Sequence, residues 1–146
     1  MFMSNSDFNW PLNDWNLSSI NSVSSLSNLF YGATSFNQPL NSWDVGGVTQ
    51  LTYMFRDATS FNQSLNNWNV SLVNNMIDMF RGATSFNGDI MTWDVGNVET
   101  MKNMFYGASS FDQNISGWNV SSVEVYSNFD TLTSEEWGTS EKPIFP

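Results

Sequence analysis

The sequence repeats itself with a period of 25 residues. Aromatic and aliphatic residues recur at this step, in register with one another, through most of the 146-residue chain. The clearest columns are Phe36, Phe61, Phe86 and Phe111; Trp43, Trp68, Trp93 and Trp118; and Ala33, Ala58, Ala83 and Ala108. Because a unit of this size cannot bury its own apolar side, the sequence predicts that successive units stack and share one core.

The pattern is irregular at both of its ends. The first unit carries a three-residue insertion between Leu17 and Val23, after which the regular step of 25 resumes. The last residue that keeps the register is Phe129, and the pattern then dissolves. We therefore expect a repeat solenoid over residues 1–130, followed by a C-terminal cap or docking tail over residues 131–146, since solenoids need capped ends.

Two apolar spacings alternate within each unit. Trp43 and Val45 are two residues apart with polar neighbours, which predicts a short half-buried strand. The next apolar residues fall at i, i+3, i+6 and i+7, the one-sided spacing of a helical or 3₁₀ turn: Val48, Leu51, Met54 and Phe55. We expect the tryptophan column and the Met-Phe pairs to lie in the core, and not to form a sugar-stacking surface.

The predicted fold is thus an α/β repeat solenoid similar to leucine-rich repeats. It has about five 25-residue coils, with a parallel sheet on one side and short helical or 3₁₀ turns on the other. A right-handed β-helix is the main alternative. The helical spacing in each unit disfavours it, because the coils of a β-helix contain no such element.

One motif carries a family resemblance. The string Met-Phe-x-Gly-Ala-Thr-Ser-Phe-Asn-Gln-x-Leu-Asn-x-Trp-Asp-Val resembles the repeat of the BspA-like leucine-rich-repeat surface proteins, found in mycoplasma-type bacterial lipoproteins and in virus-encoded proteins. The resemblance runs from Phe8 to about Phe129, and the first coil departs from the pattern. The matching residues include Met54-Phe55, Ala58, Phe61-Asn62 and Trp68-Asn69-Val70. The resemblance implies a non-enzymatic surface or adhesion role.

The composition excludes several chemistries. The chain has no histidine and no cysteine, so the usual zinc, iron–sulfur and haem ligands and the His and Cys catalytic groups are absent. A net charge of -10 with 4 basic residues disfavours nucleic-acid binding. We expect no cofactor, no metal site and no enzyme activity. A glycan-active enzyme with paired carboxylates is a distant alternative, because no pair of acids departs from the repeat.

The first candidate binding surface is the polar residue that lies between the buried Trp and Val of each unit. On the expected sheet these side chains face solvent, where amide and carboxylate groups suit sugar hydroxyls, polar protein surface or Ca²⁺. An ordinary solvated ladder is the alternative, and whether Ca²⁺ binds stays open. The column is Asn16, Asp44, Asn69, Asp94 and Asn119.

The second candidate surface follows the Met-Phe pairs: Tyr31, Arg56, Arg81 and Tyr106. Tyr and Arg are enriched at protein interfaces, so this edge column is a candidate interface; the alternative is a cover over the Met-Phe layer. The end piece offers Trp137, Ile144 and Phe145, which either fold back as a cap or dock into a neighbouring subunit.

The predicted function is a surface-displayed structural or adhesion module that mediates protein–protein or host-surface recognition. Its expected partners are protein neighbours in a surface assembly, and a glycan or host receptor. The first residues, Met1 to Asp7, lack the basic start and apolar stretch of a signal peptide, and no long apolar run predicts membrane insertion. We therefore expect display on a virion, with a fragment of a bacterial cell-surface adhesin as the alternative.

Overall fold

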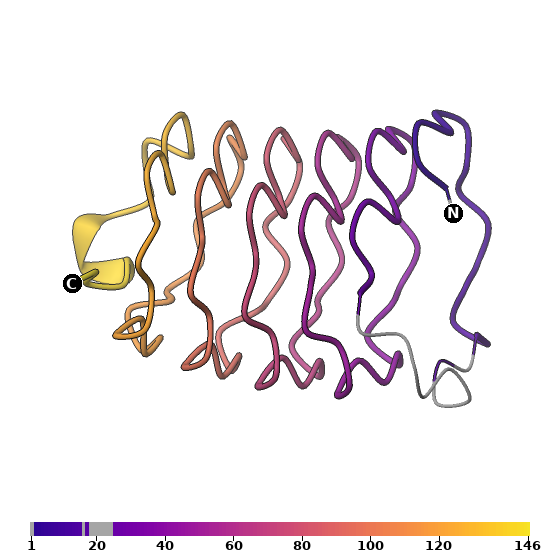
Figure 1. Ribbon diagram of the computed structural model, residues 1–146. Helices are drawn as coiled ribbons and strands as arrows, with labels where there is room; N and C mark the ends of the chain where they lie inside the picture. Colours follow the sequence, from indigo (N-terminus) through magenta and orange to yellow (C-terminus); the bar gives the residue numbers. More distant parts are fainter. Residues whose placement is uncertain (1, 16, 18–24) are drawn as a thin grey trace.

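The computed structural model describes residues 2–15, 17 and 25–146. Successive 25-residue segments form coils that lie side by side along one axis, with the N-terminus at one end and the C-terminus at the other (Figure 1). One parallel β-bridge joins each described coil to the next, through Ser25, Gln50, Asn75, Thr100 and Val125. In the described part of the chain the only helix is the 3₁₀ helix η1 (Thr139–Glu141), and the bridges extend into no strand.

The predicted α/β architecture, with its parallel sheet and helical turns, is therefore wrong. On the side expected to be helical, two residues of each coil have positive φ angles. The first column has φ between 52° and 61°: Asn28, Tyr53, Asp78, Asn103 and Asn128. The second column is Ser4, Gly32, Asp57, Gly82, Gly107 and Leu132. A left-handed residue every few positions interrupts both a right-handed helix and a pleated strand.

The backbone on this side is a run of tight turns. The amide of Leu29 donates to the carbonyl of Leu26, and that of Ala33 donates to Phe30, each over 3 residues. The positive φ falls at the third residue of each turn, where a type II turn requires it. The alternate amides are left free to pair with the following coil, as when Phe30 N donates to Met54 O at 2.9 Å.

The opposite side shows the predicted alternation of burial without the predicted sheet. Trp68 and Val70 are buried and Asn69 is exposed, but residues 68–72 make no backbone hydrogen bond to a neighbouring coil. Side chains join the coils here instead: Trp68 Nε1 donates to the Leu40 carbonyl at 2.8 Å. Stacked indoles explain the difference, because Trp68 and Trp93 have ring centroids 6.4 Å apart, whereas paired strands lie about 4.8 Å apart.

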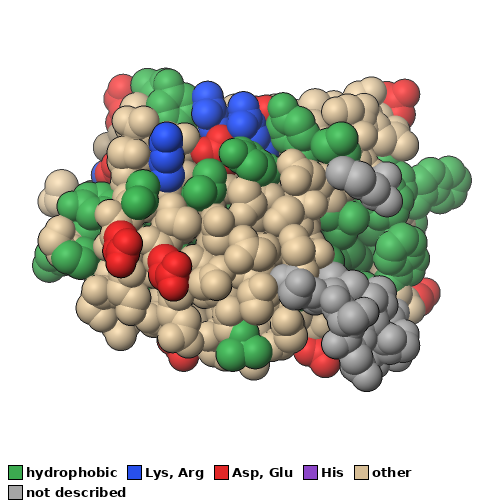
Figure 2. Space-filling view, viewed as in Figure 1, with side chains coloured by type: hydrophobic (Ala, Val, Ile, Leu, Met, Phe, Trp, Pro, Cys, Tyr) green, Lys and Arg blue, Asp and Glu red, His purple; other side chains and the backbone are tan. Residues whose placement is uncertain are grey.

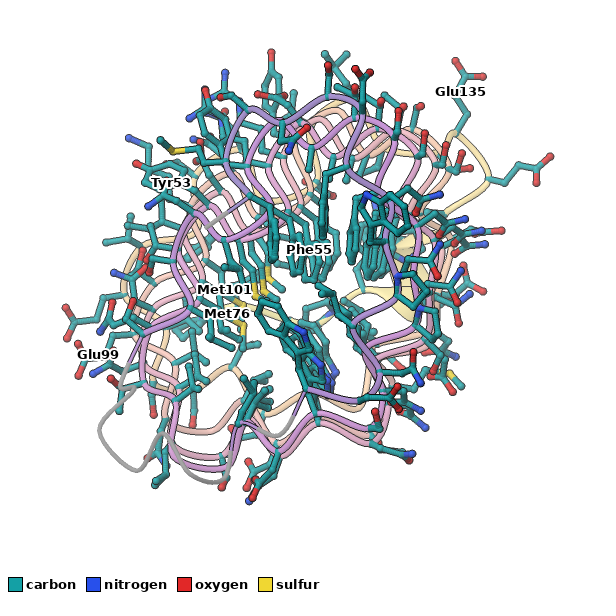
Figure 3. All side chains as sticks on the ribbon, turned by 90° about the vertical axis from the view of Figure 1, so that its right-hand side faces the viewer. Tyr53, Phe55, Met76, Glu99, Met101 and Glu135 are labelled. Atoms are coloured by element: carbon teal, nitrogen blue, oxygen red, sulfur yellow. The ribbon has the colours of Figure 1, made fainter. Side chains whose placement is uncertain are left out.

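The core consists of parallel columns of rings. Phe55 and Phe80 stack with centroids 5.5 Å apart and planes 1° apart, and the tryptophan column runs beside them with Trp43, Trp68, Trp93 and Trp118 at 3–5% exposure. In the end-on view the side chains of Phe55, Met76 and Met101 point inward, whereas those of Glu99 and Glu135 point away from the core (Figure 3). The prediction of burial is confirmed for the Met-Phe pairs and for these four tryptophans. It is wrong for Trp15, the first member of the tryptophan column, which is 49% exposed.

A ladder of amide side chains also connects the coils. The Oδ1 atom of Asn37 accepts the backbone amide of Asn62 at 2.9 Å, and Asn62 Oδ1 accepts that of Asn87 at 2.8 Å. The sequence predicts only that the Asn after each Phe occupies a turn. Its side chain in fact extends to the next coil and pairs a backbone group that would otherwise have no partner.

Candidate interaction surface

The edge column predicted from the sequence forms one surface, which we call the Arg–Tyr patch: Tyr31, Tyr53, Arg56, Arg81 and Tyr106. Each predicted member directly follows a fully buried Phe and therefore turns outward, and all are partly exposed. The Arg56 guanidinium lies 5.4 Å from the Tyr31 ring and 5.5 Å from the Tyr53 ring. The Arg81 guanidinium lies 5.0 Å from the Tyr106 ring. Cation–π contacts thus join Tyr31 and Tyr53 to Arg56 and join Tyr106 to Arg81, and the structure adds Tyr53 to the predicted column.

A buried carboxylate lies beneath the patch. Asp78 is 3% exposed, and its Oδ2 atom accepts hydrogen bonds from Arg56 Nη1 at 2.9 Å and from Arg81 Nη1 at 3.3 Å. Its Oδ1 atom accepts a hydrogen bond from Asn103 Nδ2 at 2.8 Å. A buried anion needs paired cations and further hydrogen bonds, and here three coils supply them. Asp78 therefore fixes the positions of both arginines across neighbouring coils.

Sequence reasoning missed Asp78, although a signal was present. The other members of its column are Asn28, Tyr53, Asn103 and Asn128, so it is the one acid among neutral residues. Two arginines occupy the neighbouring column. A single acidic residue in a column of otherwise neutral residues, next to a column that contains two arginines, is the sequence pattern that predicts this ion-pair network.

The patch keeps polar groups available for a partner. The side chains of Arg56 and Arg81 are 27% and 35% exposed. Asp57, 48% exposed, lies 3.4 Å from Arg56 Nε. No hydrogen bond engages the Nε and Nη2 atoms of Arg81 in the part of the chain that the structure describes. The basic side chains visible in Figure 2 gather near one edge of this face, with apolar and acidic groups around them.

The side chains of the predicted polar column are exposed, but their oxygen atoms already accept backbone amides of their own turns. Asp44 Oδ1 accepts the amide of Gly46 at 3.1 Å, and Asn69 Oδ1 accepts the amide of Ser71 at 3.2 Å. Asp94 and Asn119 make the equivalent bonds at 3.1 and 3.2 Å. Asn16 lies outside the described residues, and the sheet that was to present this column is not formed.

The acidic residues do not gather into a metal centre. Across residues 2–15, 17 and 25–146, Asp and Glu side chains form no group of three that would hold a metal ion. Nor do these residues include a helix with the length and hydrophobicity needed to span a bilayer.

The three predicted end residues have different surroundings. Trp137 is 3% exposed, packs edge-on against Phe111 at 4.9 Å, and donates from Nε1 to the Gln113 carbonyl at 2.9 Å. Phe145 stacks on Tyr126 with centroids 4.4 Å apart. Ile144 is 91% exposed. Trp137 and Phe145 thus lie as cap residues do, and Ile144 extends into solvent.

The chain is similar to one described protein family. The model of the family described as "Mycoplasma protein of unknown function, DUF285" matches residues 1–49 and 24–137, which together span nearly the whole chain. Comparison with curated proteins and with solved structures gives no match. The match agrees with the BspA-like resemblance in general; it does not extend to the leucine-rich-repeat fold.

Proposed function

We propose that this chain, which belongs to the DUF285 family of mycoplasma-type proteins of unknown function, is a non-catalytic module displayed on a surface, where it recognises a neighbouring protein. The Arg–Tyr patch carries the proposal. Its guanidinium and phenol groups form a continuous, partly exposed surface on a chain whose net charge is -10. Arg and Tyr are, together with Trp, the residue types enriched among the residues that dominate binding at protein interfaces.

The rigid support of the patch favours recognition. Since Asp78 binds both arginines and Asn103, the guanidinium groups lose little further freedom when a partner binds. The tyrosine rings supply apolar contact area with few rotatable bonds. A partner that presents carboxylate groups next to an apolar side chain matches this chemistry.

A site-specific cross-linking experiment tests the patch. A photoreactive phenylalanine analogue replaces Tyr106 in one variant and Leu72, a residue 54% exposed, in the matched control. We expect Tyr106 to give one defined cross-linked product on native particles or cells, and Leu72 to give none. Equal products from both positions, or no product from Tyr106, would contradict recognition through the patch.

The place of display is a separate part of the proposal. We propose a virus particle, and a bacterial cell surface is the alternative; the resemblance to BspA-like repeats, which both kinds of genome encode, supports either one. Mass spectrometry of purified native particles decides between them. A polypeptide absent from particles and present in a bacterial surface fraction contradicts the virion.

A further inference from the structure

The turn after the last coil carries an exposed leucine in an unusual backbone conformation. Leu132 has a φ angle of 60° and is 66% exposed. The equivalent positions of the preceding coils hold three glycines, an aspartate and a serine: Ser4, Gly32, Asp57, Gly82 and Gly107. A leucine in the left-handed region costs conformational free energy, and here the cost is not offset by burial within the molecule. This side chain is therefore suited to contact another molecule.

Two carboxylates lie on the same turn, which we call the acidic turn (residues 131–136). Glu135 and Glu136 are exposed, and neither forms an ion pair in the part of the chain that the structure describes. In the end-on view the side chain of Glu135 points away from the core (Figure 3). The acidic turn thus presents an apolar side chain and two carboxylates to solvent.

The acidic turn is held in place at both of its ends. Asp130, the residue before it, binds the ammonium group of Lys142 at 2.8 Å. Trp137, the residue after it, is 3% exposed and donates from Nε1 to the Gln113 carbonyl at 2.9 Å. A segment fixed in this way loses little further conformational freedom when it binds a partner, so the acidic turn is prepared for recognition.

The Arg–Tyr patch has the complementary groups. The Nε and Nη2 atoms of Arg81 make no hydrogen bond among the described residues, and the rings of Tyr31 and Tyr106 are partly exposed. A guanidinium group donates charge-assisted hydrogen bonds to carboxylates, and tyrosine rings offer apolar area to a leucine. The chain has 14 acidic and 4 basic residues, so few other surfaces of this molecule can receive two carboxylates.

We propose that the acidic turn of one molecule docks onto the Arg–Tyr patch of a second copy of this chain. The inference rests on the proposed function and names the neighbouring protein as another copy. Glu135 and Glu136 accept hydrogen bonds from Arg81 of the second copy, and Leu132 packs on its Tyr106 ring. Because the contact joins two different surfaces, each added copy leaves one patch and one turn available, and the assembly extends head to tail.

Sedimentation velocity of the purified full chain tests the proposal. We expect the average mass to rise with protein concentration up to about 1 mM, and to rise less at high salt, because exposed ion pairs are screened. A chain that stays monomeric at every concentration overturns the proposal.

A substitution of Leu132 separates docking from a role in the fold. Glycine is the residue that the left-handed backbone prefers, so Leu132→Gly is expected to keep or raise the melting temperature while it weakens association by about tenfold or more. The matched control is Leu72→Ser, which removes another exposed leucine and is expected to leave association unchanged. Equal association of the two variants overturns the proposal.

A mixing experiment tests whether the two surfaces bind each other. Tyr106→Ser removes part of the patch and keeps the turn, whereas Glu135→Lys combined with Glu136→Lys alters the turn and keeps the patch. Each protein alone is expected to be monomeric, and their equimolar mixture is expected to form one-to-one dimers and nothing larger. Melting of each variant confirms that it is folded. A mixture of folded variants that stays monomeric overturns the proposal.

The photoreactive analogue at position 106 distinguishes this inference from the proposed function. In the purified protein we expect it to cross-link to residues 131–136 of a second copy. If the purified chain gives no such product and position 106 cross-links to a different protein on native particles or cells, the contact between copies is overturned and recognition through the patch stands. No product in either setting overturns both.

Discussion

The two phenylalanine columns end with differently oriented rings at the two ends of the stack. At the N-terminal end the last rings of both phenylalanine columns stay parallel to their neighbours, with Phe2 at 9° to Phe30 and Phe8 at 14° to Phe36. At the C-terminal end Phe129 lies at 86° to Phe105 and Trp137 at 89° to Phe111. A parallel ring presents the same surface as the coil beneath it, whereas a perpendicular ring ends the column.

The backbone groups at the two ends differ in the same sense. Residues 131–146 provide partners where the next coil would lie: the Ile115 amide donates to the Glu141 carbonyl, and Lys142 binds Asp130 at 2.8 Å. At the N-terminal end, Trp15 Nε1, Asn9 N and Asp7 N have no hydrogen-bond partner among the described residues. Residues 131–146 therefore cover the last coil with both turned rings and substitute hydrogen bonds.

The largest effect on stability is expected in the tryptophan column, where an internal position is compared with the position at the N-terminal end. Trp68→Ala removes a buried ring and an internal hydrogen bond, so we expect it to lower the free energy of unfolding by about 3–5 kcal/mol. Trp15→Ala removes a half-exposed ring, and we expect a loss of about 1–2 kcal/mol. Urea unfolding measures both. Equal losses would mean that Trp15 is no less enclosed than the internal indoles.

The next largest effect is expected when the perpendicular ring of the C-terminal cap, that of Trp137, is removed. Trp137→Ala leaves a cavity over Phe105 and Phe111, and we expect a loss of about 3 kcal/mol together with faster amide exchange at Ile115. The control is Trp137→Phe, which keeps a ring and loses only the bond to Gln113. A stability unchanged by Trp137→Ala would show that the Trp137 ring does not cap the C-terminal end.

A smaller effect is expected inside the stack, where Asp78 forms a buried ion pair that neither end of the stack has among the described residues. Asp78→Asn keeps the shape and the left-handed backbone but removes the charge that pairs Arg56 and Arg81, so we expect a loss of about 1–2 kcal/mol. Asp57→Asn changes an exposed carboxylate beside Arg56, and we expect a change within about 0.5 kcal/mol. Thermal unfolding of the pair measures the difference. If Asp57→Asn costs more, Asp78 is not the group that organises the arginines.

The smallest effect is expected at the exposed tip of the cap. Ile144 is 91% exposed, so Ile144→Ser is expected to change stability by less than about 0.5 kcal/mol. Phe145→Ser, by contrast, removes the ring that stacks on Tyr126, and we expect a measurable drop in melting temperature. A similar drop for both variants would place Ile144 in the cap as well.

The sequence predicts burial better than backbone conformation. The predicted alternation of buried Trp43 and Val45 with exposed Asp44 is correct. The spacing of Val48, Leu51 and Met54 predicts a helical turn, and this prediction is wrong. The spacing shows only that the three side chains point to the same side of the backbone, which is not specific to a helix. A run of turns with a left-handed residue such as Tyr53 satisfies the same spacing.

The candidate surface was predicted in part for the same reason. The repeat aligns Tyr31, Arg56, Arg81 and Tyr106 in one column, and a residue that follows a buried Phe must turn outward. Nothing in the period itself places Asp78 beneath two arginines of neighbouring coils. That contact depends on how adjacent coils are placed on one another. The backbone hydrogen bonds from each coil to the next determine this placement.

The sequence by itself determined the period, the columns and the side chains that are removed from water, because apolar burial depends on residue type and spacing. The tertiary structure alone decided that coils pair through turns, amide ladders and indole bonds where a sheet was expected, since these choices depend on φ angles and on ring spacing. It also decided that the C-terminal residues cover the last coil with rings turned across the phenylalanine columns. Whether a ring lies parallel or perpendicular to its column depends on packing against neighbouring coils, which no single repeat encodes.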